Sequence, residues 1–107
     1  MNAPATEPTR VRAIARDGVT RVKLQARHVM ETGRRKNELG LLVPAHYVTE
    51  LVVTHNGRVV LDAAFGPSVS QNPYLSFAFA GGAPGDTVSV RWRDNLGASR
   101  VDEATVG

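Results

Sequence analysis

The chain has no cysteine and no long apolar run, and both absences limit what it can be. Without cysteine, residues 1–107 can form no disulfide, no thiolate metal site and no cysteine nucleophile. No run approaches the ~18 apolar residues that a membrane-spanning helix needs. Residues 1–9 have neither a basic start nor an apolar stretch, so they do not resemble a signal peptide. Taken alone, this points to the cytoplasm, unless the chain is exported while bound to a partner.

Catalytic and phosphate-binding motifs are also missing. Ser68, Ser70 and Ser76 do not lie in the Gly-x-Ser-x-Gly turn that exposes a nucleophilic serine. The glycine-rich segment 81–85 lacks the Lys-Ser/Thr pair of a phosphate-binding loop. We therefore predict that the chain is not an enzyme.

The three histidines, His28, His46 and His55, do not have the close spacing of a helical metal-binding pair. No cysteine is available to complete a zinc site around them. The sequence therefore predicts neither a metal nor a cofactor. We expect each histidine at the end of a strand, with its ring partly in water.

The net charge is +3, from eleven arginines, two lysines and ten acidic residues. Arg34-Arg35-Lys36 is the only run of cations, and the others are spread along the whole chain. This spread, together with the lack of a recognisable motif, argues against nucleic-acid binding. The run itself has two interpretations: a solvated loop, or a contact with an anion or a partner, since arginine binds carboxylates and oxyanions with two parallel hydrogen bonds.

Seven short segments have the period-two alternation or β-propensity of strands, and no segment indicates a helix convincingly. The seven are residues 10–16, 20–28, 47–55, 58–65, 74–80, 87–94 and 98–106. Asn56-Gly57 lies between two of them and is a strong hairpin signal. The regular spacing of glycine and proline indicates an all-β sandwich or barrel in a single domain. A sandwich of about seven antiparallel strands is favoured, because its two inner faces can share one core.

The alternation also assigns residues to the core. We expect Val59, Leu61, Ala63 and Phe65 to point inward from one strand. The shared core of the two sheets is predicted to contain Leu24, Leu51, Leu61, Phe77, Phe79 and Trp92. The domain spans residues 10–107, after a flexible arm formed by residues 1–9. Residues 30–44 break the pattern and are expected to form a long functional loop, with or without a helical turn.

Three motifs resemble one known family. They are His28-Val-Met-Glu-Thr-Gly-Arg-Arg-Lys36, Asn72-Pro-Tyr-Leu-Ser-Phe77 and Trp92-x-Asp94. In this order and spacing they resemble the SoxZ family of bacterial thiosulfate oxidation, over nearly the whole chain after the arm. The resemblance implies an immunoglobulin-like β-sandwich that forms a heterodimer with a SoxY-like subunit. That subunit carries the sulfur substrate on a cysteine in its C-terminal Gly-Gly-Cys-Gly-Gly arm.

The implied role is that of a non-catalytic subunit, which stabilises the carrier and helps to present its loaded arm in transient contacts with other Sox enzymes. The resemblance also implies a periplasmic location, reached by crossing the membrane together with a signal-bearing SoxY. The candidate partner-interface residues are Met30, Thr32, Gly33, Arg34, Arg35, Lys36, Asn72, Pro73 and Tyr74. Three alternatives stay open: a generic β-sandwich binding module, a small sulfur-transfer or hydrolytic enzyme, and a basic nucleic-acid binder.

Overall fold

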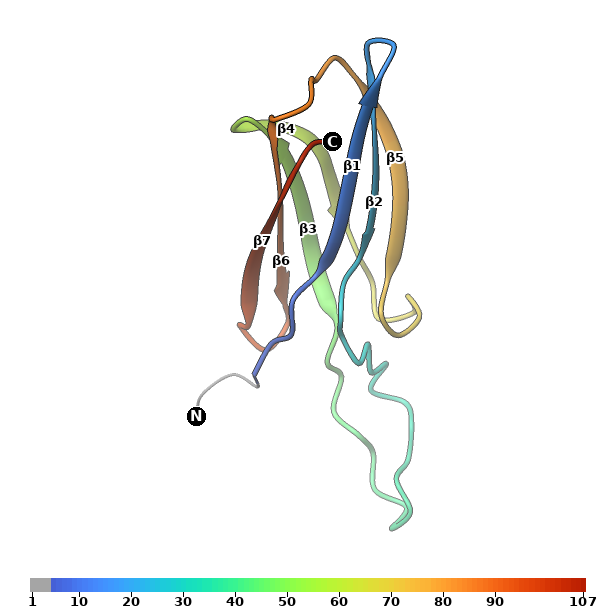
Figure 1. The fold of residues 1–107 in the computed structure, drawn as a ribbon. Helices are drawn as coiled ribbons and strands as arrows, with labels where there is room; N and C mark the ends of the chain where they lie inside the picture. The colour runs from blue at the N-terminus through green and yellow to red at the C-terminus, as the bar shows by residue number, and fades with distance from the viewer. Residues whose placement is uncertain (1–4) are drawn as a thin grey trace.

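Seven strands form where apolar and polar residues alternate, and together they build two antiparallel sheets packed face to face (Figure 1). The structure is a computed structural model that describes residues 5–107. The strands are β1 (Arg10–Arg16), β2 (Val19–Gln25), β3 (Val48–His55), β4 (Arg58–Ala64), β5 (Tyr74–Ala80), β6 (Thr87–Asp94) and β7 (Ser99–Thr105). They agree with the predicted segments to within a few residues at each end.

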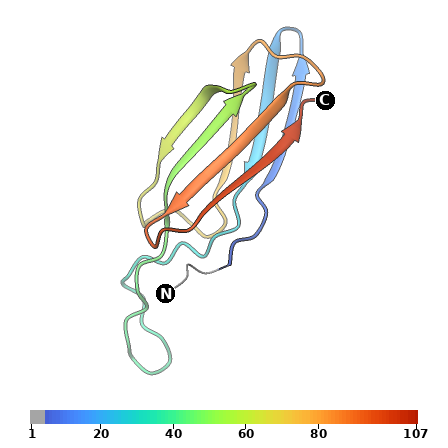
Figure 2. The same cartoon turned by 90° about the vertical axis from the view of Figure 1, so that its left-hand side faces the viewer.

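One sheet has the strand order β1-β2-β5 and the other the order β4-β3-β6-β7. In Figure 2 the four-stranded sheet faces the viewer. The chain changes sheet between β2 and β3, between β4 and β5, and between β5 and β6, as in an immunoglobulin-like sandwich. The all-β prediction is therefore confirmed. Residues 5–107 contain no helix, so none that could span a membrane, and the optional helical turn within residues 30–44 is not formed.

The core lies between the sheets and is centred on Trp92, which is 2% exposed. Around it are the inward residues of β2, β3 and β6: Val22, Leu24, Leu51, Val53, Val88 and Val90. The prediction for Leu24, Leu51 and Trp92 is thus confirmed. Leu61, Phe77 and Phe79 face the core as predicted but are only partly buried.

The partial burial has a topological cause. On one side of the sandwich, backbone hydrogen bonds from Ala15 to Gly107 and from Gly107 to Ala13 connect β1 to the end of the chain. On the other side, the edge strands β4 and β5 do not pair with each other. Apolar side chains at this open side therefore keep some contact with water.

A register shift in the β3–β4 hairpin overturns one detail of the predicted core. Val53 pairs with Leu61 but Thr54 pairs with Val59, so Val60 is an extra residue on β4. Because side chains alternate with a period of two, one extra residue turns the residues beyond it to the other face. Val59 therefore points outward and is 57% exposed, contrary to prediction.

The predicted N-terminal arm is described only from residue 5, and its first four residues lie outside the described part of the chain. Glu7 forms an ion pair with Arg27, with Oε2 3.3 Å from Nε. The backbone N–H of Thr9 donates to Asp102 at 2.9 Å. The described part of the arm thus passes along one end of the sandwich.

Candidate functional site

The segment between β2 and β3, residues 26–47, projects from one end of the sandwich and is called the projecting loop below (Figures 1 and 2). Its two limbs are joined by short antiparallel bridges. Glu31 and His46 exchange two backbone hydrogen bonds, of 2.6 and 3.0 Å. Further out, the N–H of Val43 donates to the carbonyl of Arg35 at 2.7 Å. The loop is therefore a hydrogen-bonded extension of the fold.

The tip of the loop is a turn organised by Asn37. Its side-chain oxygen accepts hydrogen bonds from the N–H groups of Leu39, at 2.9 Å, and Leu41, at 3.1 Å. Gly40 has a φ of 76°, a conformation that glycine adopts without steric cost. Leu39 is 82% exposed, and Leu41 and Leu42 are each 60% exposed. The tip thus presents three leucines to solvent.

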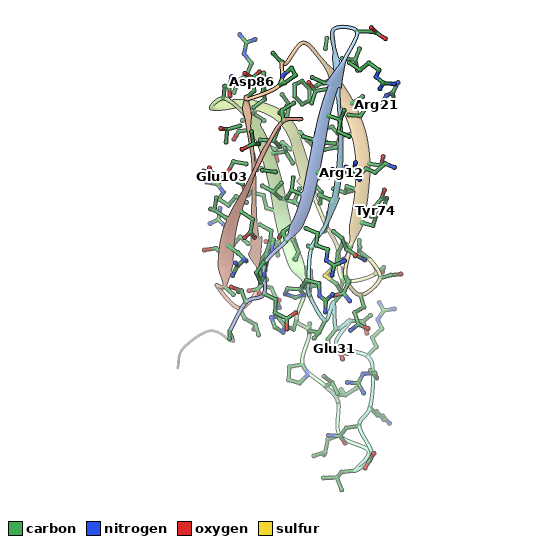
Figure 3. The ribbon with its side chains drawn as sticks, in the orientation of Figure 1. Arg12, Arg21, Glu31, Tyr74, Asp86 and Glu103 are labelled. Atoms are coloured by element: carbon green, nitrogen blue, oxygen red, sulfur yellow. The ribbon has the colours of Figure 1, made fainter. Side chains whose placement is uncertain are left out.

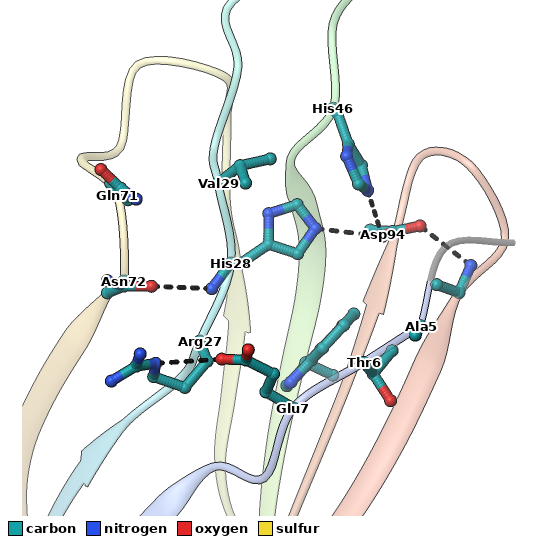
Figure 4. Close-up of a pocket in the computed structure, with 12 residues that line it drawn as sticks. Ala5, Thr6, Glu7, Arg27, His28, Val29, His46, Gln71, Asn72 and Asp94 are labelled. Atoms are coloured by element: carbon teal, nitrogen blue, oxygen red, sulfur yellow. Dashed lines mark hydrogen bonds and ion pairs between the residues drawn. The ribbon is translucent and has the colours of Figure 1, made fainter.

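The root of the loop is fixed by a buried carboxylate at the end of β6. Oδ2 of Asp94 lies 3.0 Å from Nε2 of His28, on one limb, and 2.8 Å from Nε2 of His46, on the other (Figure 4). Oδ1 of Asp94 accepts the backbone N–H groups of Leu96 and Ala98. The side chains of Asp94 and His28 are 1% and 3% exposed. His28, His46 and Asp94 form what we call the Asp94 clamp, which holds both limbs against the sandwich.

The contacts of His28 fix the position of its proton. Nδ1 lies 3.1 Å from the backbone nitrogen of Met30 and accepts its N–H. A neutral imidazole has one donor and one acceptor nitrogen, so Nε2 carries the proton and donates it to Asp94. The ring also packs edge-on against Trp92, with centroids 5.3 Å apart. His28 thus connects the loop both to the polar clamp and to the core.

The surroundings shift the ionisation of two clamp residues. Desolvation lowers the pKa of His28, and the nearby His46 acts in the same direction, which outweighs the opposite effect of Asp94. Burial alone would raise the pKa of Asp94. The hydrogen bonds from His28, His46, Ala98 and Leu96 together reverse this effect and lower the pKa. At neutral pH the clamp therefore contains an ionised carboxylate and a neutral His28.

The clamp corrects two predictions made from sequence. His28 is buried, whereas its ring was expected to lie partly in water. Residues that the sequence separates widely also come together, because His28 and His46 lie 66 and 48 positions before Asp94. The spacing of the histidines along the chain therefore did not exclude a cluster of possible metal ligands.

The ligand atoms of the clamp lie within 4.8 Å of one another, a spacing that could hold a metal ion. A metal would need the lone pair of Nε2 on His28, but the Met30 N–H bond to Nδ1 leaves the proton on that nitrogen. Metal-binding histidines ordinarily donate through their second nitrogen, whereas His28 accepts there. The hydrogen-bond pattern thus favours a proton on Nε2 of His28, shared with Asp94 in a hydrogen bond, over a metal ion at this position.

Comparison with known proteins identifies the family of this chain. The family model described as sulphur oxidation protein SoxZ matches residues 9–105. The chain belongs to the SoxZ family. This membership gives it a role in sulfur oxidation and confirms the resemblance found in the sequence motifs. A search of curated proteins found no match.

In this SoxZ-family chain, the candidate interface residues of the projecting loop have different surroundings. Thr32, Arg34 and Lys36 are exposed. Arg35 is also exposed but forms an ion pair with Glu31, with Nη2 2.7 Å from Oε1. Gly33 is half-buried beside Ala45. Of the basic run, Arg34 and Lys36 form no ion pair among the described residues.

The other candidates are Met30 and the residues around the start of β5, Asn72, Pro73 and Tyr74. Met30 is buried, and its sulfur lies 3.3 Å from the backbone nitrogen of Val48. Pro73 is buried, and Asn72 is tied to the loop, since its side-chain oxygen accepts the N–H of His28 at 3.0 Å. Tyr74 is 57% exposed on the outward face of β5. The structure therefore brings Asn72 to the root of the loop and leaves Tyr74 on the flank.

Sequence reasoning missed the leucine tip. Leu39-Gly40-Leu41-Leu42 is the one strongly apolar cluster within the region assigned as a loop, and it has neither strand alternation nor helical spacing. An apolar cluster within a segment assigned as a loop could have predicted this patch, because apolar residues in a loop that does not pack on the core remain exposed.

Proposed function

We propose that this chain is the non-catalytic subunit of a periplasmic sulfur carrier of the SoxYZ type. It binds and stabilises a SoxY-like subunit, whose C-terminal cysteine holds the thiosulfate-derived intermediate during sulfur oxidation. Membership of the SoxZ family supports this role. The lack of cysteine in these 107 residues fits it as well, because a cysteine-linked intermediate then needs a thiol from another chain.

The observation that carries the proposal is the leucine tip on an anchored loop. Three exposed leucines within four residues form an apolar patch of the kind that marks interaction sites. Burying a leucine side chain on association contributes roughly 1.5–3 kcal/mol. The bridges and the Asp94 clamp hold the loop before binding, so less conformational freedom is lost when the partner docks. Lys36 pairs with Leu42 in a backbone bridge, and both Lys36 and Arg34 are exposed cations of the same loop.

The test is co-expression with the SoxY-like protein of the same genome, followed by size exclusion and native mass spectrometry. We expect a stable 1:1 complex. The variant Leu39→Ser/Leu41→Ser/Leu42→Ser should weaken its Kd by about 100-fold or more, since three buried leucines are lost from the interface. The matched control is Val59→Ser/Leu96→Ser/Val101→Ser, which removes three similarly exposed aliphatic side chains elsewhere and should bind like the wild type.

Two results would contradict this proposal. If both proteins are folded but do not associate, the generic binding module becomes the better interpretation. If the control variant loses as much affinity as the leucine variant, the projecting loop is not the contact. Location is tested separately by cell fractionation, where we expect the chain in the periplasm only when the signal-bearing partner is co-expressed.

A further inference from the structure

The outward face of β1 and β2 gathers cations that the sequence keeps apart. Alternation directs every second residue of each strand outward, and antiparallel pairing places the two rows side by side. The cationic face, as we call it, consists of Arg10, Arg12, Arg16, Arg21 and Lys23. The spread of these cations along the chain therefore concealed a basic face, which forms only when the two strands pair.

No acidic residue lies within this face, and Asp17 is in the turn at its end. The outward positions of β1, β2 and β5 contain no aspartate or glutamate. Within residues 5–107, none of the five cations forms an ion pair. Figure 3 shows Arg12 and Arg21 on the flank opposite to Glu103. Five of the thirteen Lys and Arg residues thus lie on one surface without an ion-pair partner among residues 5–107.

The arrangement costs folding stability. Arg12 and Lys23 are direct cross-strand partners, and like charges at such positions repel each other. Most other cations of this chain have acidic neighbours, such as Arg27 with Glu7 and Arg100 with Asp102. The isolated fold therefore gives no reason for the cationic face, whereas an anionic partner would remove its repulsion.

The composition of the face favours a protein over a nucleic acid. Ile14 is 39% exposed between Arg12 and Arg16. With Val19 and the surrounding cations it lines a shallow hollow of about 430 Å³. Tyr74 flanks the same face opposite Gln25. Arginine and aromatic residues are enriched at protein interfaces, and nucleic-acid interfaces are more polar than a face with an apolar centre.

We propose that the cationic face docks an acidic protein surface, on a partner other than the subunit that binds the leucine tip. Arginine side chains of the face pair with carboxylates of that partner, and an apolar side chain of the partner covers Ile14. The face lies on the flank of the sandwich, whereas the projecting loop leaves its end (Figures 1 and 3). Both surfaces can therefore be occupied at the same time. This inference goes beyond the proposed function, because it predicts a second binding surface.

The test compares two variants with the same loss of charge. Arg12→Gln/Arg21→Gln/Lys23→Gln changes the cationic face, and Arg58→Gln/Arg91→Gln/Arg93→Gln changes the other sheet. The probes are a fluorescent peptide of glutamate and leucine and a DNA duplex matched to it in charge. Their binding is measured by anisotropy near physiological salt, on the free chain and on its complex with the SoxY-like protein. Thermal unfolding of each variant confirms that it is folded.

We expect the face variant to weaken peptide binding roughly tenfold and the control variant to change it less than twofold. The complex should bind the peptide as the free chain does. Absence of peptide binding by the wild type, or equal losses in both variants, would overturn the proposal. Tighter binding of DNA than of peptide would also overturn it and would support a nucleic-acid site. Loss of peptide binding in the complex would overturn it too, because the face would then be the interface with the SoxY-like protein. The leucine-tip variant should bind the peptide as the wild type does. Failure of the carrier proposal would therefore appear as lost binding to the SoxY-like protein with peptide binding unchanged, and failure of the present proposal as the reverse.

Discussion

The two sheets of this sandwich have the same alternation of inward and outward side chains, but they differ in how charge is distributed on their outward faces. On the outer face of the four-stranded sheet, Glu50 lies 3.4 Å from Arg91 and 3.5 Å from Arg93. Asp62 and Glu103 add further negative charge to that face. The three-stranded sheet carries five outward cations and no anion. One sheet is thus balanced internally, and the other leaves its charge to be balanced from outside.

The difference teaches where binding is expected. Exposed ion pairs contribute little to stability, typically about 0–1 kcal/mol. The main effect of the ion pairs on the four-stranded sheet is therefore to reduce the net charge of its outer face. The unbalanced sheet has a positive potential that speeds the approach of an anionic partner. The three predictions below concern first the Asp94 carboxylate that the four-stranded sheet buries, then the His28 side chain bonded to it, and last the charges that the two sheets expose.

The largest effect is expected from Asp94→Ala. The substitution removes the acceptor of His28, His46, Leu96 and Ala98 and leaves these donors unsatisfied at a buried position. We expect a loss of about 3 kcal/mol in the free energy of unfolding, measured by urea titration. The face variant Arg12→Gln/Arg21→Gln/Lys23→Gln is the comparison, since it should lose no stability. Equal stability of the Asp94→Ala variant and the wild type would show that the clamp does not anchor the loop.

Much of this fold could be predicted from the sequence because strand signals are local. Each strand of the sandwich alternates within itself, and the Asn56-Gly57 turn needs no distant information. The error at Val59 has a local cause too, but a bulge leaves no mark in a pattern of consecutive valines. The incomplete burial of Phe77 and Phe79 could not be predicted, since it depends on which edge strands fail to pair.

The candidate site was harder to predict than the strands, because it depends on which distant segments come together in the fold. The basic run and the Asn72 segment were named as candidate partner contacts, and which of their side chains a partner touches stays a prediction. The Asp94 clamp joins positions whose approach depends on the whole topology. The cationic face could have been found, because it follows from alternation in residues 10–25 and their hairpin pairing. Counting cations along the chain, without placing them on strand faces, concealed it.

The next effect concerns pH and arises at the clamp. Burial lowers the pKa of His28 below the ordinary value of 6.5, so the unfolded chain binds more protons than the folded one in the range between the two values. Stability is therefore present above about pH 6.5 and is lost as the pH falls toward the folded pKa of His28. The lowered pKa of Asp94 acts in the same direction at much lower pH.

We therefore expect the Tm of the wild type to fall between pH 7.5 and pH 5.5, by calorimetry at constant ionic strength. His28→Gln should be less stable at neutral pH and should show a flatter pH dependence. Arginine and lysine do not titrate in this range, so the variant of the cationic face should keep the slope of the wild type. A slope unchanged in His28→Gln would assign the pH dependence to groups other than His28.

The smallest effect compares the two outer faces directly, by reversing one charge on each. Lys23→Glu places a carboxylate opposite Arg12, turning a repulsive cross-strand pair into an attractive one. Arg93→Glu places a carboxylate opposite Glu50 and does the reverse. Cross-strand charge pairs contribute roughly 0.2–1 kcal/mol, so we expect Lys23→Glu to stabilise and Arg93→Glu to destabilise by about that amount in urea titrations at low salt. Both changes should shrink in concentrated salt, because exposed charges are screened. Destabilisation by both substitutions would mean that the cations of β1 and β2 already stabilise the isolated fold, and the case for an external acidic partner would lose its physical basis.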